Sequence, residues 1–397
     1  EIDKMNYDKA YILFCWSQSF GGGQNYVNSK VKYLEENGWH VVVFSIREFK
    51  DNRIVWNNLK KYSENIKSEL GYLPEFFGEK RADKIVDWMI SRIPKGIKNI
   101  IIESCTDVTA EWGERLSQKL NAKHWCFLLD ERLEEYGSKE FLYYKFKRGE
   151  VAGIHNDAMK KLFCYENVED FNKYVLVAAN GGSVQDISSN VFDEIPKADW
   201  NIAYLGRDKA YVRNIVNGVY TFAKNHSQSN INFIIMGNIN SANNIEVPEN
   251  INLINIGFLN PIPRKFFNIV DVVIAGAGCA TLSAREKCMT IVADARTFLS
   301  DGVLGITASN SLFAMGKGEN YEDTLEKVLV KHLYYRENIN VKPIEDVGIF
   351  FEKHFEFIDN SSNKKQYFDF KKNKQQIALK KKLIYLRRYI GELYGKY

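Results

Sequence analysis

The stretch from 271 to 294, DVVIAGAGCATLSAREKCMTIVAD, contains the residues best suited to chemistry in this chain. An apolar run leads into a turn with Gly276 and Gly278, a helix is predicted from about Cys279, and Glu286 lies near the end of that helix. Glycines at a strand-to-helix junction let a phosphate approach backbone N–H groups at the positive end of a helix. A carboxylate two turns further on can accept hydrogen bonds from ribose hydroxyls. The stretch therefore predicts either a site for a nucleotide diphosphate or an ordinary strand–helix turn whose small residues allow tight packing.

Two further segments of the second half could contribute to such a site. In IAYLGRDKA, Arg207 and Lys209 follow a predicted strand. Arginine offers a fork of donors and lysine a point charge, so the pair suits a diphosphate, although a solvated loop would have the same composition. In INLINIGFLN, a strand ends at Gly257-Phe258. We expect that loop to lie beside the strand leading to Gly276, where its backbone groups could reach a nucleobase.

A second glycine cluster follows the first predicted strand, in WSQSFGGGQNYV, where Gly21, Gly22 and Gly23 precede a helix. A dinucleotide site would have Gly-x-Gly-x-x-Gly here and an acid after the second strand. The spacing differs, and Ser45-Ile46-Arg47 follows that strand, which argues against a Rossmann dehydrogenase. Two interpretations remain: a surface where another molecule or the opposite domain approaches the backbone, or a tight turn.

These segments need elements that position them, and strand-like runs alternate with helix-like segments along most of the chain. Strands are predicted at Ala10–Trp16, Val41–Ser45, Ile100–Ile102, Trp125–Leu129, Tyr174–Ala178, Ile202–Leu205, Ile231–Met236, Ile251–Ile256, Val272–Ala275 and Thr290–Ala293. Helical spacing relates Val27, Val31 and Leu34 before Gly38, and Val212, Ile215, Val219 and Phe222. Such alternation predicts an α/β fold with parallel sheets covered by helices on both sides.

The polar segment at 180–200, with Pro196 near its end, is the best linker candidate. We therefore predict an amino-terminal Rossmann-like domain over 1–185, a carboxy-terminal one over 200–345, and carboxy-terminal helices over 346–397. Two doubly wound domains joined in this way are expected to face each other across a cleft. Ligands bind at the carboxyl ends of the strands in such sheets, so we expect the chemistry in that cleft.

The charge is unevenly distributed along the 397 residues, whose formal net charge is +4. Residues 371–397 contain nine Lys or Arg and one acid, Glu392, so the remaining chain is mildly acidic. Apolar residues alternate with these cations, which predicts a basic amphipathic tail. It could lie on an anionic membrane surface or fold back across the amino-terminal domain. Nucleic acid is a poor partner for an acidic body without a stacking module.

The cysteines and the hydropathy indicate a cytoplasmic protein, and the basic tail leaves open a peripheral position at the inner face of the membrane. Six cysteines are scattered without a Cys-x-x-Cys pair, which suits buried thiols in a reducing compartment. No apolar run reaches the roughly 18 residues that span a bilayer, and no signal-peptide pattern opens the chain.

Taken in order, these segments resemble the GT-B glycosyltransferases and, within them, glycosyltransferase family 4. The resemblance rests on a strand with Gly-Arg, a strand ending near Gly237, Gly257-Phe258 before Val270-Asp271-Val272, and the glycine turn with its acid. The triple glycine followed by NGWHVVVFS resembles the opening of the same family, and the likeness covers most of residues 10–300. Segments such as YYKFKRGEVAGI look like those of bacterial surface-polysaccharide glycosyltransferases.

The resemblance implies two Rossmann-like domains that transfer a hexose from a UDP- or GDP-linked donor to a glycan or lipid-linked acceptor in bacterial surface polysaccharide synthesis. It implies retention of the anomeric configuration. The nucleotide sugar is a substrate, so no separate cofactor is expected. The sequence contains no Asp-x-Asp motif, so we expect no metal at the site. Arg207, Lys209 and the helix dipole at Gly278 could instead offset charge on the departing diphosphate.

The resemblance also assigns roles to single residues. The ribose-binding second glutamate of the family's Glu-x7-Glu motif falls on Glu286, its first falls on Gly278, and the phosphate-binding arginine falls on Arg207. Glu103 occupies the strand end where the family often has a histidine near the donor sugar. The catalytic candidates are Glu103, Arg207 and Glu286, and the donor-binding candidates are Gly22, Gly23, Arg207, Lys209, Gly257, Phe258, Gly276, Gly278, Cys279, Ala280 and Glu286.

Three alternatives stay open at this stage. An inverting enzyme would need a general base, for which Glu103, Asp130, Glu131 and His155 are candidates, each also explained by a structural role. A GT-B-fold nucleotide-sugar epimerase would use the same nucleotide site without an acceptor. The missing first glutamate suggests a non-catalytic GT-B partner subunit.

Overall fold

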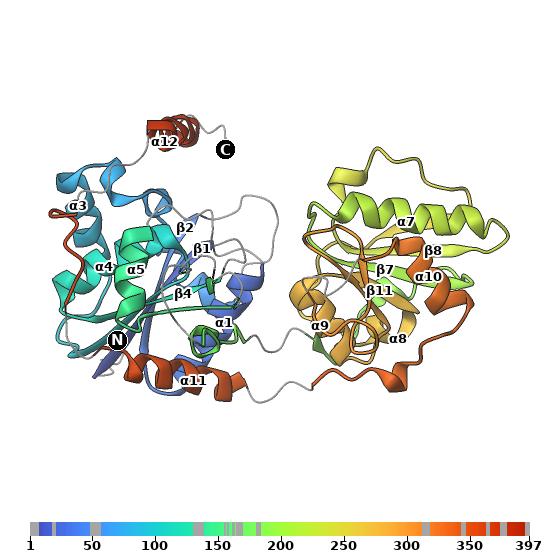
Figure 1. Ribbon diagram of the computed structural model, residues 1–397, viewed down its shortest axis with the longest axis horizontal. Helices are drawn as coiled ribbons and strands as arrows, with labels where there is room; N and C mark the ends of the chain where they lie inside the picture. The colour runs from blue at the N-terminus through green and yellow to red at the C-terminus, as the bar shows by residue number, and fades with distance from the viewer. Residues whose placement is uncertain are drawn as a thin grey trace. The chain divides into compact units, whose positions relative to one another are not determined.

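The structure is a computed structural model that describes residues 8–17, 21–47, 57–129, 139–154, 156, 159–160, 163, 170–179, 184–311, 318–342, 347–362, 366–373 and 379–393. The chain forms two compact units. Unit 1 comprises Glu1–Gly181 together with Asp346–Tyr397, and unit 2 comprises Gly182–Glu345. Each unit has its own sheet and helices (Figure 1), and each is described by itself.

Unit 1 contains a five-stranded parallel sheet in the order β2-β1-β3-β4-β5. Its strands are β1 (Lys9–Ser17), β2 (His40–Arg47), β3 (Asn99–Ser104), β4 (Lys123–Leu128) and β5 (Val151–Gly153). Alternate side chains of β1 enter separate cores: Tyr11 and Leu13 pack on one face, and Ile12 and Phe14 on the other. A strand buried on both faces must be apolar throughout, which is why β1 reads as a continuous hydrophobic run.

Helices cover both faces of this sheet. One face packs against α1 (Gly22–Glu36) and α11 (Val347–Asn360), and the other against α3 (Glu79–Ile90) and α4 (Asp107–Leu120). The predicted spacing of Val27, Val31 and Leu34 is confirmed, because all three are buried on α1. Among its described residues, unit 1 also contains α2 (Asn57–Lys60), α5 (Lys139–Lys147), α12 (Leu379–Leu393) and short 3₁₀ turns at Ser63–Asn65, Ser68–Gly71, Pro74–Phe76 and Asn172–Tyr174.

The strand predicted at Tyr174–Ala178 is wrong. The segment begins with a 3₁₀ turn and makes one isolated bridge, between Val175 and Gly153 of the short strand β5. The Val177 carbonyl accepts a hydrogen bond from the ring of His354 on α11, at 2.9 Å. A backbone group satisfied by a side chain does not need a ladder partner, so the apolar run lies against the sheet edge without extending it.

Unit 2 contains a six-stranded sheet in the order β13-β12-β11-β7-β8-β9. Its strands are β7 (Trp200–Gly206), β8 (Ile231–Gly237), β9 (Ile251–Asn255), β11 (Val272–Ala275), β12 (Thr290–Ala293) and β13 (Ser300–Val303). All five strands predicted in this half are confirmed. The sequence did not predict β13, which is short, polar and antiparallel to β12. A two-stranded pairing joins β6 (Val184–Gln185) to β10 (Ile262–Pro263).

The helices of unit 2 also cover both faces of its sheet. α7 (Val212–Asn225) and α10 (Tyr321–Leu325) pack on one face, and α8 (Lys265–Ile269) and α9 (Ala277–Arg285) on the other. The described part of unit 2 also has a π-helical turn at Glu326–Val330 and 3₁₀ turns at Asn190–Phe192, Asn240–Ala242 and Arg336–Asn338.

Each sheet has one point where the strand order reverses. This switch point lies between β1 and β3 in unit 1 and between β7 and β11 in unit 2. In doubly wound sheets, ligands bind outside the carboxyl ends of the strands at such a point. The loops that follow these four strands are therefore the places to look for chemistry.

No helix within the described part of the chain combines the length and the apolar character needed to cross a membrane.

Candidate functional site

The switch point of unit 2 brings together two of the segments singled out by sequence. Strands β7 and β11 are parallel neighbours, with Ile202 opposite Val272. The loop with Arg207 follows β7, and the turn with Gly276 follows β11. Parallel strands present their carboxyl ends at one edge of a sheet, so the arginine loop and the glycine turn share that edge.

The glycine turn opens helix α9 two residues earlier than predicted, at Ala277, with Gly276 as its N-cap residue. A Cβ atom on Gly276 would lie 2.7 Å from the Tyr211 hydroxyl oxygen and 3.0 Å from the Ala293 carbonyl oxygen. Only glycine fits there without movement of its neighbours. Gly278, in contrast, is exposed, and a Cβ atom on it would meet nothing within 4 Å. The first turn of α9, which includes Cys279 and Ala280, thus begins beside the closely packed Gly276 and has open space at Gly278.

The loop after β7 is held by hydrogen bonds of its backbone and of the Asp208 carboxylate, while its cations are exposed; the Asp208 N–H donates to the Asn238 side chain at 2.9 Å. The Tyr204 hydroxyl donates to the Arg207 carbonyl at 2.5 Å. The Asp208 carboxylate accepts hydrogen bonds from the backbone N–H and hydroxyl of Ser241, at 2.8 and 2.6 Å. The side chains of Arg207 and Lys209, on either side of Asp208, are exposed. A fixed backbone with two exposed cations is suited to an anionic ligand, because little loop ordering is needed when the ligand binds.

Electrostatics connects these cations to helix α9. Burial raises the pKa of the Cys279 thiol, and the positive charges of Arg207 and Lys209 act on it in the opposite direction. Both cations are therefore close enough to the first turn of α9 to influence it. The helix N-terminus adds its own partial positive charge at the same place.

Glu286 lies at the other end of α9, as its C-cap residue. Its carboxylate forms an ion pair with the Arg264 guanidinium, whose Nε also donates to Asp186 at 2.9 Å. The Glu286 side chain is only 16% exposed. A ribose approaching this carboxylate would have to share it with Arg264, a partner that the sequence analysis missed.

The loop with Gly257 and Phe258 follows the edge strand β9, which β8 and β7 separate from β11. The expectation that this strand's end lies directly beside β11 is therefore wrong, because consecutive strands continue outward from β7. Gly257 has φ of 74°, in the left-handed region that glycine tolerates best, and its N–H donates to the Asn255 side chain at 3.0 Å.

The structure contradicts a catalytic role for Glu103 in contact with substrate. Its side chain on β3 is 0% exposed. Its carboxylate accepts hydrogen bonds from the hydroxyls of Tyr11 and Tyr26, at 2.6 and 2.5 Å, and pairs with the Lys30 ammonium at 2.5 Å. Burial raises the pKa values of both tyrosines, and the negative charge of Glu103 adds to that effect. Glu103 thus joins β3 to β1 and α1 inside the core.

His354 of α11 completes this buried cluster. Its Nε2 donates to the Val177 carbonyl, so in the neutral ring Nδ1 is the acceptor, 3.1 Å from the Lys30 ammonium nitrogen. Burial and the charge of Lys30 lower the pKa of His354 to about 2, which keeps the ring neutral. The rings of Tyr11 and Trp125 each have their centroid 5.0 Å from that ammonium nitrogen. No spacing in the sequence pairs Lys30 with a histidine so far along the chain.

Gly22 and Gly23 form the first turn of α1, beside the switch point of unit 1. A Cβ atom on Gly22 would meet nothing within 4 Å, and one on Gly23 would lie 3.5 Å from the Leu129 side chain. The start of α1 therefore has open space beside its backbone. The other general-base candidates, Asp130, Glu131 and His155, lie outside the described residues.

A second buried group of charges, at the opposite side of the unit 1 sheet, was also missed by sequence. The Glu114 carboxylate on α4 is 2.9 Å from the Lys145 ammonium, 2.8 Å from Nδ1 of His124, and accepts from the Phe368 backbone N–H at 2.9 Å. Burial alone would raise the pKa of Glu114, but Lys145 and His124 outweigh it and hold the value to about 2. Burial, with Lys145 beside it, lowers the pKa of His124 to about 4. This group fastens the returning segment around Phe368 to unit 1.

Five of the six cysteines lie in the described residues, and all five are free thiols, of which Cys15, Cys105, Cys126 and Cys288 are buried. Within those residues, no cluster of three or more His, Cys, Asp or Glu side chains is arranged to hold a metal ion.

Comparison with known proteins gives structural likeness without sequence likeness. No family model matches the chain, and no curated protein matches it. Among solved structures, a glycosyltransferase from Rickettsia africae superposes with a TM-score of 0.58 at 14% identity, covering 89% of this chain and 98% of that one. The UDP-GlcNAc 2-epimerase of Methanocaldococcus jannaschii, solved with UDP-GlcNAc and UDP, gives 0.50 at 13% identity, covering 88% and 99%. HepE of Anabaena, solved with UDP and glucose, gives 0.51 at 11% identity, covering 88% and 99%.

These likenesses establish the fold. The chain consists of two Rossmann-like α/β units of the GT-B type, as predicted. Its structural neighbours include both glycosyltransferases and UDP-sugar epimerases, and identities of 11 to 14% carry no further conclusion.

Proposed function

We propose that this protein acts on a nucleotide-diphosphate sugar, and that the diphosphate binds at the switch point of unit 2. The observation that carries the proposal is the juxtaposition of exposed Arg207 and Lys209 with the open first turn of α9. Two cations and a helix N-terminus offer charge-assisted hydrogen bonds to an anion whose own hydration they replace. The complexes of structural neighbours with UDP support a uridine nucleotide as the first ligand to test.

The reaction that we favour is glycosyl transfer to a glycan or lipid-linked acceptor of a bacterial surface polysaccharide. Arg207, Lys209 and the α9 dipole would stabilise negative charge on the departing diphosphate without a metal ion. Retention of configuration and membership of glycosyltransferase family 4 are implied by the sequence resemblance alone. A cytoplasmic location and contact of the basic tail with an anionic membrane belong to the same proposal, since a lipid-linked acceptor would be found there.

Epimerisation of a UDP-sugar is the second candidate, because solved 2-epimerases share this fold over nearly their whole length. A non-catalytic partner subunit is the third. It is supported by Gly278, which leaves open space where the resemblance would place an acid. All three candidates use the same nucleotide site, so they are separated by turnover and not by binding.

The first experiment is thermal melting of the full chain with UDP, GDP, ADP and their sugars, with Glu286→Ala beside it. A ligand that binds only the folded state raises the melting temperature. We expect a shift with one nucleotide that is reduced in the variant. No shift with any nucleotide, in a folded protein, would contradict the proposal.

The second experiment incubates the chain with the sugar of the nucleotide that binds and follows the products. Transfer to an added membrane or glycan extract would support the transferase. Conversion of the donor to its 2-epimer without an acceptor would replace it by the epimerase. Binding without turnover would favour the partner subunit.

A further inference from the structure

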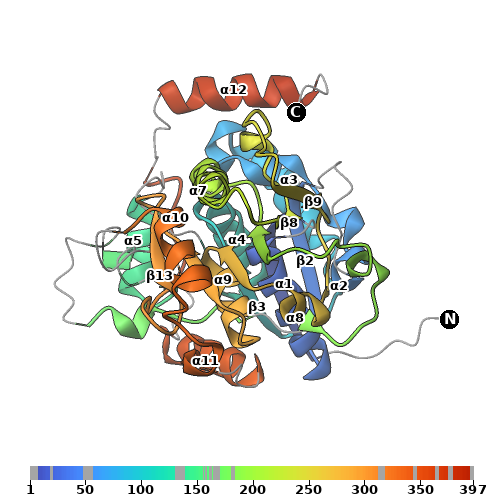
Figure 2. The same ribbon diagram turned by 90° about the vertical axis from the view of Figure 1, so that its right-hand side faces the viewer.

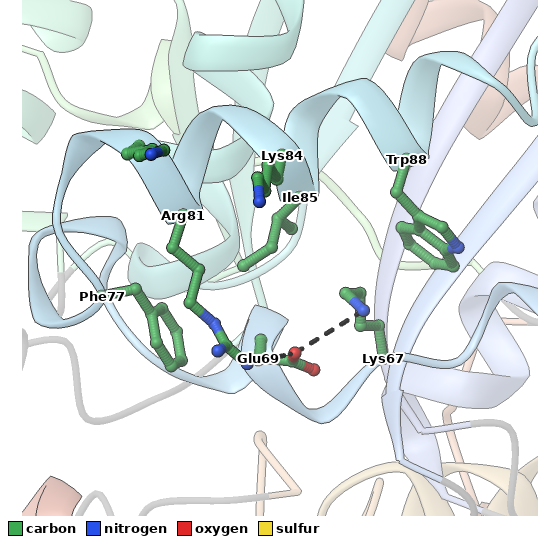
Figure 3. A pocket seen from close by; sticks show the side chains of 8 residues that line it. Lys67, Glu69, Phe77, Arg81, Lys84, Ile85 and Trp88 are labelled. Carbon is green, nitrogen blue, oxygen red and sulfur yellow. Dashed lines mark hydrogen bonds and ion pairs between the residues drawn. The ribbon is translucent and has the colours of Figure 1, made fainter.

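A cationic groove runs along helix α3 of unit 1. It has a volume of about 440 Å³, and its lining includes the cations Lys67, Lys80, Arg81 and Lys84, with Glu69 and Trp88 between or beside them. Figure 3 shows Arg81, Lys84 and Trp88 along the helix, with the Glu69–Lys67 pair below them. Positive charge therefore dominates the groove.

The charge balance of α3 explains why its lysines remain available. Its acids face α4: Glu79 accepts from Arg115 at 3.0 Å, and Asp83 and Asp87 lie 3.3 and 2.9 Å from the Lys119 ammonium. Inside the groove, the single Glu69 carboxylate lies 3.2 Å from Arg81 and 3.6 Å from Lys67.

Lys80 and Lys84 have no ion-pair partner among the described residues, and both are exposed. They lie four positions apart, which places them on one face of α3. Two adjacent, uncompensated ammonium groups favour a partner with several negative charges.

Helix α12 continues this surface. Its inner side packs on unit 1: Tyr385 is 7% exposed, and the Tyr389 hydroxyl accepts from the Arg81 guanidinium at 3.0 Å. Arg81 also lines the groove, so the helix and the groove are contiguous. Figures 1 and 2 both show α12 beside the α3 end of unit 1.

The outer side of α12 is apolar and exposed. Leu383, Ile384, Leu386 and Ile390 are 59, 56, 47 and 43% exposed, and Lys382 and Arg387 are exposed among them. The inner side of α12 already packs on the protein, so apolar side chains on its outer side add no stability in water. Exposed apolar surface of this kind marks an interaction site. Apolar side chains flanked by cations match the boundary between acyl chains and anionic headgroups.

We propose that the α3 groove and the outer side of α12 together form a docking surface for an anionic phospholipid bilayer, with lipid phosphates in the groove at Lys80 and Lys84. Leu383, Leu386 and Ile390 would enter the headgroup–acyl boundary. The inference deepens the membrane contact of the proposed function. The proposed function assigns that contact to the basic tail alone, whereas the groove adds cations from the amino-terminal half of the chain. The surplus of one sign of charge beside apolar side chains favours a bilayer over a protein partner, whose surface would be mixed in sign.

Co-sedimentation of the full chain with vesicles tests the proposal, in the absence of nucleotide. We expect binding to vesicles that contain phosphatidylglycerol and none to pure phosphatidylcholine. Each lysine near an anionic surface contributes about fivefold in affinity, so Lys80→Gln combined with Lys84→Gln should weaken binding roughly 25-fold. Leu383→Ser combined with Ile390→Ser should abolish it, with an unchanged melting temperature because both side chains are exposed.

The matched control is Lys224→Gln combined with Lys331→Gln, which removes the same charge from exposed positions of unit 2. It should bind vesicles like the wild type. Equal weakening in both lysine pairs would mean that net charge alone acts, and would overturn the proposal. The absence of binding to anionic vesicles would also overturn it. So would release of the protein from the vesicles by inorganic phosphate at a concentration equal to that of the lipid phosphate.

The melting shift with nucleotide is measured on the same variants. Lys80 and Lys84 lie in unit 1, so the Lys80→Gln and Lys84→Gln variant should show the same melting shift with nucleotide as the wild type. Loss of vesicle binding with an intact nucleotide shift, or the reverse, tells which of the two proposals has failed.

Discussion

The two units contain sheets of the same doubly wound kind, yet they place charge near their switch points in opposite ways. In unit 2, Arg207 and Lys209 are exposed on a loop that hydrogen bonds from Tyr204 and Ser241 hold in place. In unit 1, Glu103 and Lys30 are fully buried against each other. An exposed cation can exchange its bound water for a ligand. A buried ion pair cannot release one member to a ligand without leaving the other as an unpaired buried charge. The comparison indicates that the buried charges of unit 1 hold helices in place, whereas Arg207 and Lys209 of unit 2 stay exposed, as the binding that we propose would require.

The largest effect is expected from breaking the buried pair. Lys30→Met leaves the Glu103 carboxylate buried without its cation, which should lower the free energy of unfolding of unit 1 by about 3–5 kcal/mol. Urea denaturation followed by circular dichroism measures it. Adding Glu103→Gln removes the orphaned charge and should recover most of the loss. A Lys30→Met protein as stable as the wild type would refute the structural role of the pair.

Acid should destabilise unit 1 through its second buried group. The folded-state pKa of Glu114 is about 2 against an ordinary value of 4.5, so its stabilisation is complete above about pH 4.5 and lost as the pH falls toward 2. The pKa of His124 is about 4 against 6.5, so the folded state resists a proton that the unfolded state accepts, and stability falls between pH 6.5 and 4. Both shifts act in the same direction. The Glu114 share is on the order of 3 kcal/mol.

The measurement is urea denaturation of the wild type and Glu114→Gln at a series of pH values from 7 to 3. The variant should be less stable at pH 7 and should lose less stability on acidification. Parallel curves for the two proteins would show that Glu114 does not carry the pH dependence.

In unit 2, the charge should matter for binding and not for folding. Arg207→Ala should weaken UDP binding about 10- to 100-fold, the range expected for one or two charge-assisted hydrogen bonds. The melting temperature without ligand should stay within a degree or two, roughly, because the side chain is exposed. Arg213→Ala, an exposed arginine on α7 that bonds Asn244, is the control in calorimetric titration. Equal loss in both variants would remove Arg207 from the site.

The smallest effect separates the two glycines of the α9 turn. Gly276→Ala brings a methyl group against Tyr211 and the Ala293 carbonyl, so the free energy of unfolding of unit 2 should fall by about 1–3 kcal/mol. Gly278→Ala meets nothing and lies within a helix, so it should be neutral or stabilise by up to about 1 kcal/mol. If both substitutions destabilise equally, the close packing at Gly276 is not the cause.

Much of unit 2 could be predicted from the sequence because its signals are local. The apolar runs of β7, β8, β9, β11 and β12 were found where they occur, and the turn between β11 and α9 was recognised from its glycines. β13 was not found, because a four-residue polar strand has no period to detect. The predicted position of β9 beside β11 was also wrong, since strand order depends on how the crossovers pack and not on the strand's own residues.

The interpretation of Glu103 failed for a different reason. Its position at a strand end was predicted correctly, but its function depended on Tyr11, Tyr26, Lys30 and His354, which approach from three other elements. Similarly, the sequence showed Glu286 near the end of a helix but not the Arg264 that pairs with it.

By itself, the sequence determined the α/β class, most strands, the helix periodicities and the glycine turn, because hydrophobic period and turn chemistry act over a few residues. Only the tertiary structure decided which charges are exposed and which are paired. Burial and partner choice depend on residues tens to hundreds of positions apart that meet only after packing. That is why Arg207 remains a candidate for binding and Glu103 does not.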